Sequence, residues 1–89
     1  MEETNPEAKA AILEVIENQL SDNDPPETAE TLNRLVSEGI TQEDAMLYLG
    51  QAVCVEIWDI MTNGQEFDLE RYKRNLARLP KEPEERRSN

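Results

Sequence analysis

Pairs of acidic residues spaced three apart are the groups in this chain that come nearest to a metal-binding or catalytic site. On a helix, two carboxylates at this spacing share one surface, and Mg²⁺ binds to oxygen ligands of this kind. The candidate pairs are Glu14 with Glu17, Glu27 with Glu30, and Glu56 with Asp59. Because 20 of the 89 residues are acidic, such pairs also arise by chance, so we favour solvent-exposed helix faces. Glu56 is the exception, because it lies at the edge of an apolar helix face, where partial burial beside an arginine or lysine is expected.

The chain lacks the other residue types on which common active sites depend. It has no histidine and a single cysteine, Cys54, which excludes the usual zinc sites and histidine-based acid–base catalysis. We expect Cys54 to be a buried, inert thiol, because it lies on the apolar face of a helix. The Asp22-Asn23-Asp24 segment lacks the glycine and the distant glutamate of a calcium-binding loop. The sequence therefore predicts no catalytic residue, no metal site and no cofactor.

The charges divide the chain into an acidic body and a basic end. The net charge is −11, and residues 1–70 contain 17 acidic residues against Lys9 and Arg34, whereas residues 71–89 contain seven basic residues against three acidic ones. A nucleic-acid binder needs a surplus of lysine and arginine on some face, so this class is disfavoured. We expect the basic end to pack over the acidic body. The alternatives are a docking role for the basic end and mimicry of nucleic acid by the acidic body.

No segment is apolar over the roughly 18 residues that a membrane-spanning helix needs. The N-terminal MEETNPEAKAA is acidic where a secretory signal would be basic, and one cysteine cannot form an internal disulfide. We therefore expect no membrane partner and a cytoplasmic location.

Capping residues and prolines divide the chain into four predicted helices. Thr41 and Asp44 have the spacing of a capping box, and Phe67 is placed to pack on Tyr72 across the start of the last helix. The predicted helices cover about residues 5–20, 24–39, 41–62 and 68–79. The third ends at Asn63-Gly64, and the fourth begins at Asp68, with Leu69 on its apolar side and Arg71 on the opposite side. We predict an all-α domain over residues 1–79, a compact antiparallel four-helix bundle with the third helix central, followed by a flexible charged tail over residues 80–89.

The third helix has an apolar face of roughly 180°, which is wide for a helix that packs on two short neighbours. This face holds Met46, Leu47, Leu49, Gly50, Val53, Cys54, Ile57, Trp58, Ile60 and Met61, whereas Asp44, Tyr48, Gln51, Val55, Asp59 and Thr62 are predicted to point away. A glycine in mid-helix costs about 1 kcal/mol, so Gly50 indicates a close helix crossing. Core packing is the favoured role of Met46, Trp58 and Met61, and a homodimer contact is the alternative.

Several helix-capping features resemble those of a family of small bacterial proteins classified only as a domain of unknown function. They are Asn5-Pro6, Gln19-Leu20, Asp24-Pro25-Pro26, Gly39 and Ile57-Trp58. The resemblance implies a bacterial source but no activity. Members of that family carry histidines on the first and third helices, and this chain has none, so a metal-linked role is not carried over.

A Glu-x-x-Glu followed later by a Glu-x-x-Asp also resembles the metal-binding signature of the all-α nucleotide pyrophosphohydrolases related to MazG. This resemblance implies Mg²⁺-dependent nucleotide hydrolysis through Glu14, Glu17, Glu56 and Asp59. The chain departs from the signature, because Leu13 precedes Glu14 where the family has a glutamate, and because the gap between the two motifs is longer.

The main hypothesis is a non-enzymatic helical module for protein–protein interaction or assembly, with an unidentified protein or a second copy as partner. Its candidate interaction residues are Met46, Gly50, Trp58 and Met61. The alternative is a pyrophosphohydrolase-like enzyme that uses the paired carboxylates. The two differ in what the fold must show: the first needs an exposed apolar face, and the second needs converging acids.

Overall fold

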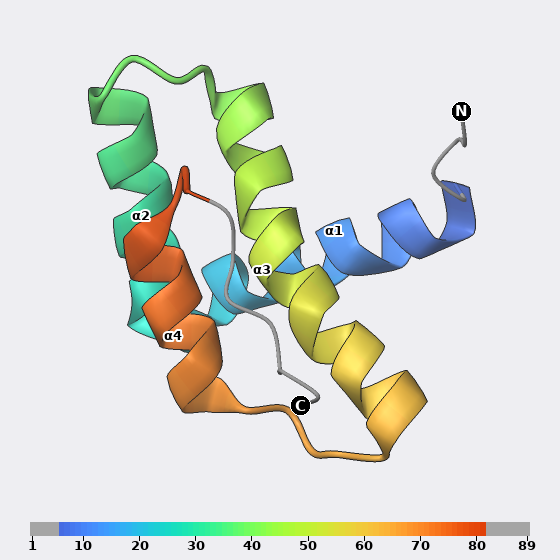
Figure 1. Cartoon of the computed structure of the whole chain (residues 1–89). Coiled ribbons are helices and arrows are strands. Elements are labelled where there is room, and N and C mark those ends of the chain that lie inside the picture. The colour runs from blue at the N-terminus through green and yellow to red at the C-terminus, as the bar shows by residue number, and fades with distance from the viewer. Residues whose placement is uncertain (1–5, 82–89) are drawn as a thin grey trace.

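The computed structural model describes residues 6–81, which form four α-helices and no strand (Figure 1). The helices are α1 (Pro6–Asp22), α2 (Pro26–Ser37), α3 (Gln42–Asn63) and α4 (Leu69–Arg78). The predicted all-α bundle is therefore confirmed. Two predictions lie outside the described residues: Asn5 as the cap of the first helix, and most of the tail, residues 82–89. None of the helices within residues 6–81 combines the length and the apolar character that crossing a membrane requires.

The ends of α1 and α2 share one hydrogen-bonding pattern. After α1, Asn23 adopts a left-handed conformation (φ 53°), and the Asp24 amide donates to the Gln19 carbonyl. After α2, Gly39 does the same (φ 101°), and the Ile40 amide donates to the Leu35 carbonyl. Both are Schellman motifs, in which a residue with positive φ lets the chain turn back on the last helical turn. The turn-forming residues in the sequence had predicted both ends.

The predicted N-caps of α3 and α4 are also present. The Thr41 hydroxyl accepts the Asp44 amide at 3.1 Å, and the Asp68 carboxylate accepts the Arg71 amide at 3.0 Å. The Phe67 ring packs edge-on against Tyr72 at 5.3 Å between ring centroids. The two capping hydrogen bonds satisfy amides that the first turn of a helix leaves unpaired.

Helix α3 is the centre of the domain. It packs against α1, α2 and α4, whereas α2 and α4 lie side by side on one flank of it (Figure 1). In the same view α1 runs across the back of α3 instead of along it. The close crossing predicted at Gly50 is observed here, because a Cβ atom at this position would lie 3.4 Å from Ile12 Cγ2.

The buried face of α3 differs from the predicted one. At 100° per residue it is rotated by about the angle of one residue, because Glu56 and Asp59 are buried and Trp58 and Met61 are not. The prediction that Asp59 points away from the core was therefore wrong. The buried apolar residues of the described chain are Ile16, Leu35, Ala45, Leu49, Ala52, Val53, Tyr72, Leu76 and Leu79.

Helix α4 is rotated for the same reason. Arg71 was expected on the outer side, but it is only 7% exposed, whereas Leu69, expected on the packed side, is 42% exposed. The buried carboxylates of α3 account for this, because Arg71 binds both of them in the interior.

Candidate interaction surface

The contact between α3 and α4 contains a buried cluster of charges. Arg71 donates from Nε to Glu56 Oε2 at 2.6 Å, and from one terminal nitrogen to Glu56 Oε1 and to Asp59 Oδ2, each at 2.9 Å. Glu56 is fully buried and Asp59 is 4% exposed. The predicted burial of Glu56 beside a basic residue is thus confirmed, and burial is complete.

The remaining hydrogen-bonding capacity of these carboxylates is also used. The backbone amide of Asp68 donates to Glu56 Oε1 at 2.8 Å, and the Asn63 side chain donates to Asp59 Oδ1 at 2.6 Å. The hydrogen bond to Glu56, with that to Asp59, raises the pKa of Arg71 further above its already high ordinary value, although burial opposes the shift. The cluster is therefore a set of satisfied structural contacts that holds the loop before α4 and α4 itself against α3.

The carboxylates considered for a metal site are not brought together. Glu14 and Glu17 are exposed on α1, whereas Glu56 and Asp59 are buried against Arg71. Among residues 6–81, no group of three or more acidic or cysteine side chains is placed to hold a metal ion. The pattern that resembled a pyrophosphohydrolase signature thus has no common site in this fold.

A second polar cluster joins α1, α2 and α4. Gln19 Oε1 accepts from the hydroxyls of Tyr72 and Thr28, both at 2.7 Å, and the two hydroxyls lie 3.3 Å apart. Burial raises the pKa of Tyr72, and the two hydrogen bonds oppose this shift. Sequence reasoning missed this cluster, but a signal was present: Gln19 is a polar residue on the apolar side of the first helix.

One face of α3 is left largely uncovered by the other helices, although Ile12 of α1 packs on it at Gly50. We call it the α3 stripe, and it consists of Leu47, Gly50, Cys54, Trp58 and Met61. Trp58 is 66% exposed, Met61 74% and Leu47 48%. The predicted core role of Trp58 and Met61 was therefore wrong, as was the predicted burial of Cys54, which is an exposed free thiol. These residues recur every three or four positions, so they line one side of the helix.

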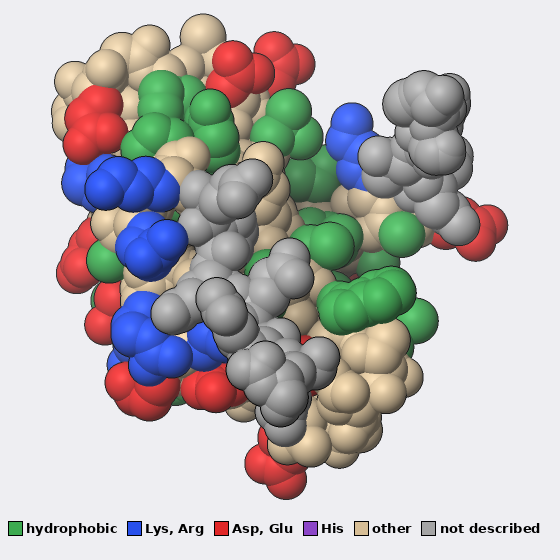
Figure 2. All heavy atoms as spheres, in the orientation of Figure 1, with side chains coloured by type: hydrophobic (Ala, Val, Ile, Leu, Met, Phe, Trp, Pro, Cys, Tyr) green, Lys and Arg blue, Asp and Glu red, His purple; other side chains and the backbone are tan. Residues whose placement is uncertain are grey.

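The α3 stripe is free of exposed charge. Residues 47–61 contain two charged side chains, Glu56 and Asp59, and both are buried on the opposite side of the helix. This is unusual in a chain of which 33% is charged. Figure 2 shows the contrast, with lysine and arginine side chains gathered over α2 and α4 and hydrophobic side chains over α1 and α3.

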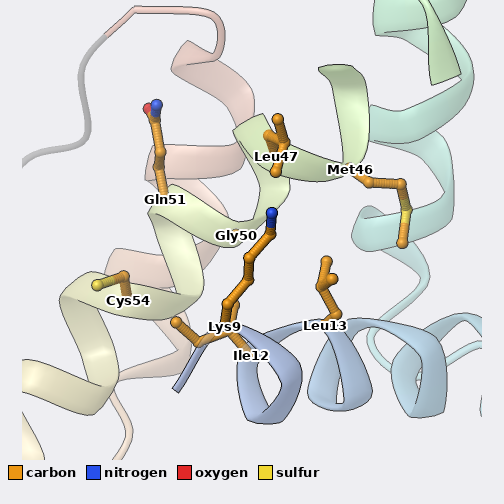
Figure 3. Close-up of a pocket in the computed structure, with 8 residues that line it drawn as sticks. All are labelled: Lys9, Ile12, Leu13, Met46, Leu47, Gly50, Gln51 and Cys54. Carbon is orange, nitrogen blue, oxygen red and sulfur yellow. The ribbon is translucent and has the colours of Figure 1, made fainter. Parts of the chain in front are cut away.

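Next to the stripe, α1 and α3 form an open, mainly apolar pocket of about 380 Å³ (Figure 3). Its lining residues are Lys9, Ile12, Leu13, Met46, Leu47, Gly50, Gln51 and Cys54. Leu13 and Met46 point toward one another from the two helices, and the Lys9 side chain reaches from α1 toward Gly50. Gly50 and Ile12 form the part of the pocket wall where α1 packs on α3.

The structure thus gives the four predicted interaction residues different places. Met46 is half-buried in the pocket, Gly50 lines its wall, and Trp58 and Met61 extend the same face toward the end of α3. Leu47, Cys54 and Lys9 belong to this surface but were not among the predicted interaction residues. No protein family, curated protein or solved structure matches this chain, so the geometry of this surface is what bears on its function.

Proposed function

We infer that the protein is a non-enzymatic helical module that binds another protein chain through the α3 stripe. The main observation that supports this proposal is the exposed apolar α3 stripe, which lies within a span, residues 47–61, that has no exposed charge. The core of a protein interface is typically depleted of charged residues and enriched in aromatic and methionine side chains. Trp58 is the expected anchor, because tryptophan is the residue type most enriched at energetic hot spots.

The cost of leaving this face in water also supports the proposal. Burial of apolar surface contributes about 25 cal/mol per Å², and a tryptophan side chain offers up to roughly 250 Å². With Trp58 two-thirds exposed, the domain forgoes a large part of this energy as long as the stripe has no partner. Contiguous apolar patches of this kind mark sites of interaction more often than single exposed residues do.

The same proposal assigns the protein to the cytoplasm of a bacterium. The support for the location is the exposed thiol of Cys54, which stays reduced in a compartment with a reducing redox balance. The support for the source is the resemblance of the helix-capping features to the bacterial family described above.

A photo-crosslinking amino acid placed at position 58 tests this function in cells. We expect discrete crosslinked products of defined mass, whatever the partner, because the side chain at position 58 would lie inside the interface. The matched control carries the same group in place of Ser37, an exposed residue of α2 outside the stripe. Equal, diffuse crosslinking from both positions would exclude the α3 stripe as a binding surface.

A further inference from the structure

We propose that the partner of the α3 stripe is a second copy of this chain. The two α3 helices pair antiparallel about a twofold axis at Cys54, and Trp58 of each copy enters the α1–α3 pocket of the other. This proposal rests on the proposed function and names its partner. Three observations support the dimer: the spacing of the residues in the stripe, the shape of the pocket and the charges around the pocket.

The spacing of the stripe is symmetric about Cys54. Gly50 lies four residues before Cys54 and Trp58 lies four residues after it. Leu47 and Met61 stand seven residues to either side. A twofold axis that passes through position 54 of two antiparallel helices brings each residue opposite its mirror position. Trp58 therefore meets Gly50 of the second copy, and Leu47 meets Met61.

The shapes at these mirror positions are complementary. Trp58 has a large side chain that is 66% exposed, whereas Gly50 has no side chain and lines the pocket beside Ile12 of α1. The pocket of about 380 Å³ is large enough to accept an indole ring. Trp58 and the pocket beside Gly50 lie at equal distances from Cys54 along the helix. A symmetric antiparallel pair therefore makes the contact between them twice.

The charges allow two acidic chains to meet at this face. Each chain carries a net charge of −11, so most pairs of surfaces would repel one another. The α3 stripe has no acidic residue, and Lys9 is the one charged residue that lines the pocket among residues 6–81. A lysine beside the entering indole ring is attracted to the negative face of the ring. The pocket therefore offers the tryptophan an apolar wall and a cation.

Cysteine crosslinking of the full purified chain tests the geometry. We use a bismaleimide shorter than the roughly 10 Å that separates the axes of packed helices. Cys54, the one cysteine of the chain, lies on the proposed axis, so the unaltered protein should give a covalent dimer in high yield. In a Cys54→Ser, Met61→Cys variant the two thiols lie about 21 Å apart in the antiparallel pair, because each residue adds 1.5 Å along a helix. This variant should not crosslink.

Two further variants complete this experiment. Cys54→Ser combined with Leu47→Cys and Met61→Cys restores interchain crosslinking in the antiparallel pair, since positions 47 and 61 then face one another. Cys54→Ser with Ser37→Cys reports random collision, because Ser37 is exposed and outside the stripe. Crosslinking of the Met61→Cys variant as strong as that of Cys54 would show a parallel pair and overturn the proposal, as would no crosslinking above the Ser37→Cys background.

The fluorescence of Trp58 provides an independent measurement, because it is the one tryptophan of the chain. Its emission should shift to shorter wavelength as the protein concentration rises and the indole ring leaves water. Trp58→Glu should raise the dissociation constant of the dimer, measured by sedimentation, about 30-fold or more, as expected for loss of a tryptophan anchor. Val36→Glu, which changes an exposed apolar residue of α2 outside the stripe, should leave the constant unchanged.

These outcomes separate the dimer from the broader function. If the purified chain remains monomeric while position 58 gives a discrete crosslinked product with a different protein in cells, the dimer is wrong and the interaction module stands. If position 58 gives no discrete product in cells and the chain is also monomeric, both proposals fail.

Discussion

Arg71 makes the two buried charge contacts between α3 and α4. Its guanidinium group lies between Glu56 and Asp59 of α3, and its own helix begins three residues earlier at the Asp68 cap. Buried ion pairs of this kind add little net stability compared with apolar packing, but removal of one partner leaves a buried charge without compensation. Without Arg71, the carboxylates of Glu56 and Asp59 would stay buried with neither water nor a cation beside them.

Arg71→Met should therefore destabilise the domain strongly. We expect a loss of about 3–5 kcal/mol in the free energy of unfolding, measured by urea denaturation followed by circular dichroism. Lys73→Met is the matched control on the same helix, because Lys73 forms a long, half-exposed 3.8 Å pair with Glu27 that is worth about 1 kcal/mol. A similar small loss for both variants would contradict the structural role assigned to the buried cluster.

Tyr72 should give the fold a dependence on alkaline pH. Burial raises its pKa above the ordinary value of about 10, so the folded state keeps the phenolic proton after the unfolded state has lost it. This stabilisation is fully present below pH 10 and is lost as the pH rises from about 10 through the folded-state pKa. Tyr72→Phe should flatten this alkaline decrease in unfolding free energy, whereas Tyr48→Phe, which retains Tyr72, should keep it. An unchanged pH profile in Tyr72→Phe would exclude this assignment.

At the scale of the helices, the sequence predicted what is decided locally. The Thr41 and Asp68 caps, the stop at Gly64 and the contact of Phe67 with Tyr72 depend on residues within a few positions of one another. These signals gave the four helices and nearly all their ends. The N-cap of α1 falls at residue 5, outside the described chain.

The orientation of α3 was not predictable in the same way. It has apolar residues on two sides, and the choice between them depends on Arg71, which is 15 residues from Glu56 in the sequence. Once Glu56 and Asp59 turn inward to this arginine, Trp58 and Met61 must turn outward. If every charged residue of such a helix is assumed to be exposed, its apolar face is placed one residue's rotation away. The Gln19 cluster was not predictable for a similar reason, because the hydroxyl that binds Gln19 belongs to Tyr72, 53 residues later in the chain.

Alanine substitutions at the two glycines in and directly after α3 should change the free energy of unfolding in opposite directions. A Cβ atom on Gly50 would lie 3.4 Å from Ile12 and 3.9 Å from Ile16, which are ordinary contacts, so Gly50→Ala should stabilise the monomer by about 1 kcal/mol through helix propensity. Gly64 has φ 66° at the end of α3, so Gly64→Ala should destabilise by about 1 kcal/mol despite the open space around it. Urea denaturation of dilute protein measures both. Destabilisation by Gly50→Ala would show that the crossing tolerates no side chain.

At the scale of the whole molecule, the other three helices leave part of the surface of α3 uncovered. Helices α2 and α4 pack on one flank and α1 crosses the back, so the α3 stripe is left to solvent (Figure 1). Such a small domain has a modest core, and association is a common way to add buried surface. Pairing through the stripe would place α3 at the centre of the dimer as well as at the centre of each chain.

The thermal stability of the protein should consequently depend on its concentration. Above the dissociation constant, each tenfold increase in concentration stabilises the folded dimer by about 0.7 kcal/mol per chain, since only the folded chain associates. For a domain of this size the unfolding temperature should then rise by about 3–6 °C per tenfold increase, measured by circular dichroism in cells of different path length. Trp58→Glu should show no such dependence. A carboxylate in this mainly apolar pocket would lose its hydration and would leave most of the space of the indole ring unfilled. A rise of equal size in Trp58→Glu would mean that association, if it occurs, uses a surface other than the α3 stripe.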